Sequence, residues 1–319
     1  MKKIPLILDG DPGHDDAIAW TLAKASSIFN IMAVTSVAGN QELAKTTYNA
    51  MRICTLLGIK APIAKGREVP LLSDLITAGN FHGESGLDGP SLPEPNMTLS
   101  ALSAVSLMAK VLQESKEKVT IVATGPLTNI AELLVAHPEL KEKIEQISIM
   151  GGGLRNGNWT AAAEFNIFED PEAADIVFKS GIPLIMCGLD VTEKAIIYPE
   201  DAQKIRNLNN SVANIVADWL EFFFKHHREL GWQGAPLHDP CAIAVLLKPE
   251  IFTMRKAYVQ IDTGGHYTRG ATIGDFDGKL SAKKCNVQVV VDIKREEFIQ
   301  LLIDNFQTYK NHEVKICKI

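Results

Sequence analysis

The sequence has no excess of basic residues. Of its 319 residues, 32 are Lys or Arg and 38 are Asp or Glu, which gives a formal net charge of −6. Without surplus positive charge the chain has little with which to neutralise a phosphate backbone, so we expect no nucleic-acid partner. No apolar run approaches the roughly 20 residues that span a bilayer, and we expect no membrane partner. The apolar stretch after Lys3 stops at Asp9, too early for a signal peptide.

Cysteines are few, and no pairing pattern is evident among them. The five are Cys54, Cys187, Cys241, Cys285 and Cys317, with no CxxC spacing. An odd, scattered set in a chain of this length is typical of a reduced, cytoplasmic protein and disfavours a thiolate zinc site. The glycine patterns GxGxxG and GxxxxGK[ST] are also missing. Their absence disfavours a dinucleotide site and a phosphate-binding P-loop.

Short apolar runs alternate with segments of helical spacing through much of the chain. Strands are expected at Ile4–Leu8, Ile31–Val37, Ala61–Lys65, Val119–Ala123, Ile144–Met150, Pro183–Cys187, Tyr258–Ile261 and Val287–Val291. Helices are expected between them, for example over Leu43–Leu57 and Val212–Leu230. This alternation predicts an α/β fold, with a mostly parallel central sheet flanked by helices in an open Rossmann-like arrangement. No linker or repeat divides the chain, so we expect one domain over residues 1–319.

The densest polar signal follows the first expected strand. Asp9, Asp11, Asp15 and Asp16 place four carboxylates within eight residues, with no Lys or Arg among them. The dipole at a helix N-terminus accounts for Asp15 and Asp16. It does not account for Asp9 and Asp11 on the same turn, where like charges repel. Because Ca²⁺ and Mg²⁺ prefer carboxylate oxygen, the spacing predicts a metal site at this turn.

Three further segments carry polar residues at the expected ends of strands or starts of helices. His238 precedes Asp239, which offers a titratable imidazole beside a carboxylate. Thr124 lies in a strand-to-helix turn where its carbonyl could bind a metal. A long loop that opens with three glycines contains Asn158, Glu164 and Asn166. Their side chains offer the hydrogen-bond donors and acceptors that bind sugar hydroxyls. Each segment alone has an ordinary structural explanation, such as Asp239 capping a helix.

Together these segments strongly resemble the inosine–uridine-preferring nucleoside hydrolase family, in its histidine-containing branch. The most specific match is the opening Asp-x-Asp-Pro-Gly-x-Asp-Asp, from Asp9 to Asp16. Further matches follow in the family's order from Ile7 to Phe306. They are Val37-Ala38-Gly39-Asn40, His82-Gly83-Glu84-Ser85-Gly86, Thr124-Gly125-Pro126-Leu127-Thr128-Asn129, Met150-Gly151-Gly152-Gly153, Glu164-Phe165-Asn166 and His238-Asp239-Pro240.

The resemblance implies a Ca²⁺-dependent enzyme of ribonucleoside breakdown and salvage that releases ribose and a free nucleobase. It implies that Ca²⁺ is held by Asp11, Asp16, Asp239 and the carbonyl of Thr124. Asp11 would also be the general base for a metal-bound water, and His238 would assist departure of the base. The ribose and the rest of the substrate would be bound by Asp15, Asn40, His82, Asn158, Glu164 and Asn166. A homo-oligomer, dimer or tetramer, is implied as well.

The resemblance is weakest at the nucleobase. Members of this branch usually carry Tyr or Gln on the helix before His-Asp-Pro, whereas this chain has Phe222 to Leu230 there, without tyrosine. His226 occupies the best-matching turn, and Trp159 offers an aromatic face beside Asn158. A purine-only enzyme would be expected to use a tryptophan sandwich. We therefore expect a preference for pyrimidine ribonucleosides, or a broad one.

Two other functions remain open from the residues alone. The first is an Mg²⁺-dependent phosphohydrolase of the Asp-x-Asp type, with Asp9 as nucleophile and Asp11 as acid. Such enzymes carry Thr or Val two residues after the second Asp, where this chain has Pro12-Gly13. The second is a non-catalytic nucleoside- or sugar-binding protein with a structural metal. The presence of His238 beside Asp239 and of Asp11 argues against it.

Overall fold

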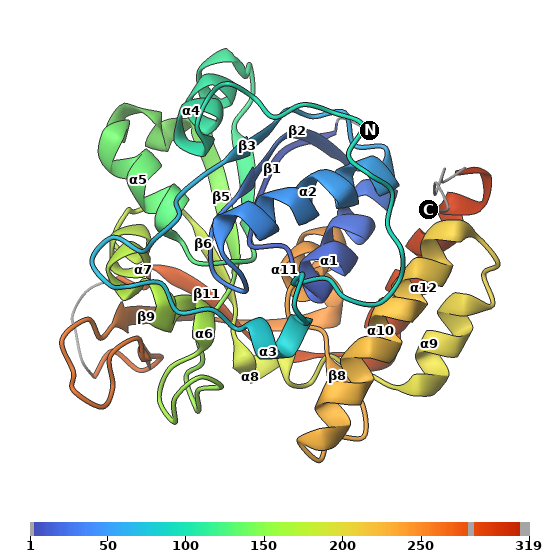
Figure 1. The fold of residues 1–319 in the computed structure, drawn as a ribbon. Coiled ribbons are helices and arrows are strands. Elements are labelled where there is room, and N and C mark those ends of the chain that lie inside the picture. The colour runs from blue at the N-terminus through green and yellow to red at the C-terminus, as the bar shows by residue number, and fades with distance from the viewer. Residues whose placement is uncertain (1–2, 280–283, 313–319) are drawn as a thin grey trace.

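The computed structural model describes residues 3–279 and 284–312. A nine-stranded sheet runs through its centre in the order β10-β9-β11-β6-β5-β4-β1-β2-β3 (Figure 1). Its strands are β1 (Ile4–Gly10), β2 (Phe29–Ser36), β3 (Ile63–Lys65), β4 (Val119–Ala123), β5 (Ile144–Met150), β6 (Leu184–Cys187), β9 (Phe252–Ile261), β10 (Thr272–Asp275) and β11 (Val287–Ile293). A small antiparallel pair joins β7 (Ile196–Ile197) to β8 (Ala235–Pro236).

Helices cover both faces of the sheet. They are α1 (His14–Ala25), α2 (Leu43–Leu57), α3 (Gly79–His82), α4 (Ala104–Glu114), α5 (Thr128–Ala136), α6 (Phe165–Glu169), α7 (Pro171–Phe178), α8 (Leu189–Thr192), α9 (Pro199–Arg206), α10 (Ser211–Glu229), α11 (Pro240–Leu247) and α12 (Arg295–Phe306). One apolar core lies under α1, α2, α10, α11 and α12, and a second under α4, α5 and α7. The mostly parallel sheet between helical layers is therefore confirmed.

The parallel strands determine where the polar segments meet. β1 pairs in parallel with β2 and β4, and β5 with β4 and β6. Their carboxyl ends consequently lie at one edge of the sheet, where open α/β folds bind ligands. The turn after β1, the turn after β4 and the loop after β5 all start at this edge.

Some elements differ from the sequence expectations. The expected strand Tyr258–Ile261 is longer, as β9, and it pairs in antiparallel fashion with both β11 and the unpredicted β10. The long segment after Gly66 contains the short helix α3, and the loop after β5 leads into α6, whose first turn is capped by Glu164. Cys54, Cys187 and Cys241 are buried free thiols, while Cys285 is exposed and Cys317 lies outside the described residues. In the described part of the chain, no helix has the length and apolar character to cross a bilayer.

We predict that the central strands carry much of the stability. Ile121 in β4 is fully buried, whereas Ile273 in the edge strand β10 is 44% exposed. Ile121→Ala should lower the free energy of unfolding by about 2–5 kcal/mol, because it leaves a cavity in a close-packed core. Ile273→Ala is the matched control, and urea denaturation measures both. Equal losses in the two variants would contradict the assignment of the core.

Candidate active site

Asp9, the first carboxylate of the acidic turn, is buried and has a structural role within the sheet. It accepts hydrogen bonds from Thr35 Oγ1 at 2.5 Å and from Asn129 Nδ2 at 2.8 Å. Burial raises its pKa to about 6. Asp9 therefore ties β1 to β2 and to the start of α5 and does not line the neighbouring cavity. This placement argues against Asp9 as the nucleophile of a phosphohydrolase.

Asp11 lies in a space that two glycines leave open. A Cβ on Gly39 would come within 2.2 Å of Asp11 Oδ2, and one on Gly125 within 2.5 Å of Oδ1. The backbone N–H of Asn40 donates to Oδ2 at 2.7 Å, whereas Oδ1 is buried without a hydrogen-bond partner. Burial, and next the charge of Asp16, raise the pKa of Asp11 well above its usual value. An orphaned buried carboxylate oxygen calls for a cation or a water.

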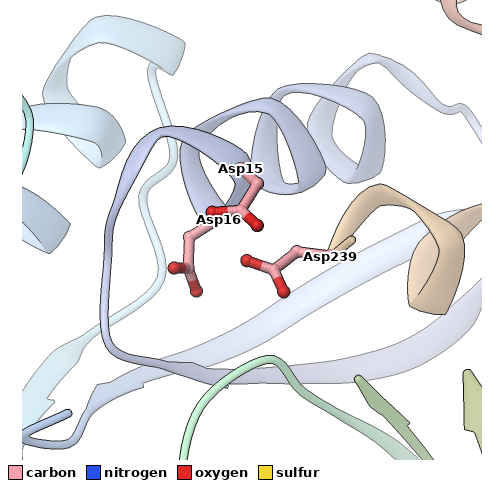
Figure 2. Close-up of side chains that lie close together, drawn as sticks. All are labelled: Asp15, Asp16 and Asp239. Carbon is pink, nitrogen blue, oxygen red and sulfur yellow. The ribbon is translucent and has the colours of Figure 1, made fainter. Parts of the chain in front are cut away.

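Asp15, Asp16 and Asp239 point toward one another from the first turn of α1 and the start of α11 (Figure 2). One oxygen from each lies within 4.8 Å of the others. Burial, and next the charge of Asp15, raise the pKa of Asp16 to about 7. The same two causes raise the pKa of Asp239 well above its usual value. The cluster differs in one member from the ligands implied by the family resemblance: it contains Asp15 in place of Asp11. Asp11 is still close enough for its charge to contribute to the raised pKa of Asp239.

The donor set suits a hard divalent cation. Among the described residues, no Lys or Arg forms an ion pair with these aspartates, so their mutual repulsion is uncompensated within the protein. Asp16 accepts from Gly13 N at 3.0 Å and from Thr124 Oγ1 at 2.6 Å, which fixes its carboxylate. The Thr124 carbonyl, also expected as a ligand, accepts from Asn166 Nδ2 at 3.1 Å. Oxygen donors in such a cluster fit Ca²⁺ or Mg²⁺.

A cavity of about 390 Å³ lies beside the aspartates. It is lined by ten of the residues selected from the sequence: Asp15, Asn40, His82, Thr124, Asn158, Trp159, Glu164, Asn166, His238 and Asp239. Asp11 and Asp16 are fully buried next to it and are not in its lining. His226 is not in its lining either. The adjacent His227 is, while His226 makes an edge contact with Phe81.

The polar side chains expected to bind sugar hydroxyls are held in place by hydrogen bonds with the backbone. Glu164 accepts from the N–H groups of Gly152, Asn166 and Ile167. Burial nevertheless raises its pKa. Asn158 accepts from Phe165 N at 2.9 Å. Such fixed polar side chains can discriminate hydroxyl patterns because their orientation is set before a ligand arrives.

Three histidines, His82, His227 and His238, line the cavity, and burial lowers the pKa of each. Burial lowers the pKa of His238 to about 4 and that of His82 to about 3. His238 Nδ1 lies 2.8 Å from Thr192 Oγ1, and His82 Nδ1 lies 3.1 Å from His14 Nδ1. If the Thr192 hydroxyl donates to Nδ1, the proton of His238 is on Nε2. In this neutral form His238 can donate a hydrogen bond from Nε2, but it must take up a second proton before it can act as an acid.

One wall of the cavity is aromatic, and most of its residues were not expected from the sequence. Phe81, Phe223, His227 and Trp232 line it, along with Leu230. Phe223 contacts His227 with ring centroids 4.4 Å apart, and His227 contacts Trp232 at 6.4 Å. The i, i+4 spacing of Phe223 and His227 on α10 is the signal that could have identified this wall.

Comparison with known proteins gives a consistent result. The family model for inosine-uridine preferring nucleoside hydrolases matches residues 6–300. A pyrimidine-specific ribonucleoside hydrolase RihA of Shewanella woodyi is 55% identical, covering 96% of this chain and 98% of its own. The RihA of Escherichia coli O1:K1 is 54% identical, covering 96% and 99%.

Solved structures share the architecture. The purine-preferring ribonucleoside hydrolase from Gardnerella vaginalis superposes with a TM-score of 0.90 at 32% sequence identity, covering 96% of this chain and 99% of its own. The match therefore extends over the sheet, both helical layers and the loops that carry the cavity. The chain belongs to the inosine-uridine preferring nucleoside hydrolase family.

Proposed function

We propose that this nucleoside hydrolase cleaves the N-glycosidic bond of pyrimidine ribonucleosides with the help of Ca²⁺, giving ribose and the free base. The observation that carries the proposal is one cavity lined by two unlike sets of side chains. Buried carboxylates and amides form one set, and aromatic rings with three histidines form the other. A ribonucleoside has the same division between a polyol and a flat ring. The names of the 54–55% identical relatives support the pyrimidine assignment.

The polar set of side chains is assigned to the ribose. Five polar residues of the lining are available for this role. They are Asp15 of the aspartate cluster, Asn40, and Asn158, Glu164 and Asn166 from the segment after β5. Cleavage of an N-glycosidic bond builds positive charge on the ribosyl ring. Preorganised carboxylates stabilise that charge more in the transition state than in the ground state, which accelerates the reaction.

Asp11 and His238 are assigned the proton transfers. Asp11 has an unpartnered buried oxygen and a raised pKa, which suits a general base that takes a proton from the attacking water. His238 faces the cavity beside the aspartates; once doubly protonated, it would pass its Nε2 proton to the departing base as that base gains negative charge, and return to the neutral imidazole. A Ca²⁺ ion held by Asp11, Asp16, Asp239 and the Thr124 carbonyl would offset the clustered charge and polarise the water.

The same proposal includes the setting of the enzyme. We place it in the cytoplasm as one catalytic domain, supported by the nine-stranded sheet that runs through its centre and by three buried free thiols. A homo-oligomer, dimer or tetramer, is proposed by analogy with the family. The product pair fits salvage of nucleobases from ribonucleosides.

Removal of the metal should abolish turnover without unfolding the protein. In chelator, the free energy of unfolding should fall as pH rises from 3.8 towards 7, because Asp16 titrates near 7 when folded and near 3.8 when unfolded. The folded state binds more protons in that window, so deprotonation destabilises it. Urea denaturation at a series of pH values, with and without added Ca²⁺, measures the free energy of unfolding. Added Ca²⁺ should flatten its dependence on pH. Full turnover in chelator would contradict the metal assignment.

Asp11→Ala should lose far more turnover than His238→Ala on a substrate with a good leaving group. Proton donation helps a poor leaving group by about a hundredfold to ten-thousandfold, and an activated aryl group needs little of that help. The measurement compares kcat on p-nitrophenyl riboside and on uridine for both variants. An equal loss for His238→Ala on the two substrates would show that His238 is not the acid.

Ribonucleosides should be strongly preferred over 2′-deoxyribonucleosides. Buried polar groups that lose a hydroxyl partner remain unpaired, and such sites can reject the deoxy analogue by about four orders of magnitude. Much of the loss should appear in kcat, because the contacts strengthen as the ring gains charge. The test compares kcat/KM for uridine and 2′-deoxyuridine. Comparable values would contradict the roles given to Asp15, Asn166 and the metal.

A further inference from the structure

Glu193 is a carboxylate that lines the active-site cavity and is not part of the aspartate cluster. It follows α8 directly and is partly buried. Its neighbour Thr192 holds His238 Nδ1 at 2.8 Å, so Glu193 lies one residue from the group that fixes the proposed acid. Neither the metal site nor the ribose contacts described above use this side chain.

The position of Glu193 assigns it to the nucleobase. The chain after it runs beside the segment that leads to His238: Leu237 N donates to Ala195 O at 3.0 Å, and β7 pairs with β8. Tyr198 and Ile196 then line a second hollow together with Leu230 and Trp232. Leu230 and Trp232 also line the main cavity, in its aromatic wall. Glu193 therefore shares the cavity lining with Leu230 and Trp232 and lies three residues before the second hollow that they also line, and this connectivity is the basis for assigning it to the base.

Among the described residues, Glu193 forms no ion pair with the basic residues next to it or next to its partner Asn156 in the sequence. Lys194 Nζ lies 3.1 Å from Asp292 Oδ1, and Arg155 Nε lies 3.8 Å from Asp190 Oδ1. Asn156 Nδ2 donates to Glu193 Oε1 at 3.0 Å. This bond orients the carboxylate, and its second oxygen makes no hydrogen bond with the described residues. An ionised carboxylate can only accept hydrogen bonds.

We propose that Glu193 is a specificity-determining residue that favours a base with an exocyclic amino group, cytosine, over uracil. The proposal rests on the function proposed above. Cytosine presents an N4 amino donor at the position where uracil presents an O4 acceptor. A carboxylate accepts from the amino group in a charge-assisted hydrogen bond and repels the carbonyl oxygen. Uracil also carries an N3–H, but this donor is flanked by two carbonyl oxygens that face the same charge.

The test uses Glu193→Gln in the full-length, Ca²⁺-loaded enzyme. Glutamine keeps an oxygen that can accept a hydrogen bond from Asn156, so the contact between these two residues is retained while the negative charge is lost. Its amide can also donate to uracil O4. We expect the ratio of kcat/KM for cytidine to that for uridine to fall by about tenfold to a hundredfold. The matched control is Glu145→Gln, an exposed site at the start of β5, which should leave the ratio unchanged.

An unchanged ratio in Glu193→Gln, or an equal loss on both substrates, would overturn the proposal. Asn156→Ala provides a second variant: it frees the carboxylate without removing it and should lower the ratio less than Glu193→Gln does. Binding of free cytosine and free uracil, measured by calorimetry, should show the same shift. Absence of turnover of either nucleoside by the unmodified enzyme would contradict the proposed function instead, and the calorimetry would still test Glu193.

Discussion

The burial of several carboxylates at one point, without a basic partner in the described residues, is the constraint on which the site depends. Each element at the carboxyl edge of the sheet accommodates it. Gly39 and Gly125 leave room for Asp11, the turn before α1 supplies a backbone donor to Asp16, and α11 brings in Asp239 from a distant part of the sequence. Such an arrangement is costly for an empty protein and becomes favourable when a hard cation occupies it.

The same burial gives the cavity its polarity. The carboxylates have raised pKa values and the histidines lowered ones, because desolvation disfavours the charged form of both. Neutral imidazoles do not compete with a cation for the carboxylates. The flat face of a nucleobase can therefore pack against the aromatic wall while the carboxylates stabilise charge on the sugar.

Much of the fold and of the site could be predicted from the sequence because their signals are local. Buried parallel strands are continuous apolar runs, and Val119–Ala123 and Ile144–Met150 end as expected. The edge strand β10 has no such run. The residue of α10 that faces the cavity could not be predicted without the rotation of the helix about its axis. Consecutive residues of a helix point about 100° apart, so His227 lines the cavity while His226 does not. Glu193 belongs to none of the motifs in the sequence, although it follows β6 and α8 at the carboxyl edge of the sheet.

The most direct measurement of the central claim is the number of protons released when Ca²⁺ binds. Calorimetric titration of the chelated protein in two buffers of different ionisation enthalpy gives this number. At about pH 6, below the pKa of about 7 for Asp16, we predict about one proton or more released per Ca²⁺ bound, because metal ligands must be deprotonated. The release should vanish at alkaline pH and weaken in Asp16→Asn. Absence of Ca²⁺ binding, or binding with no proton release at about pH 6, would contradict it.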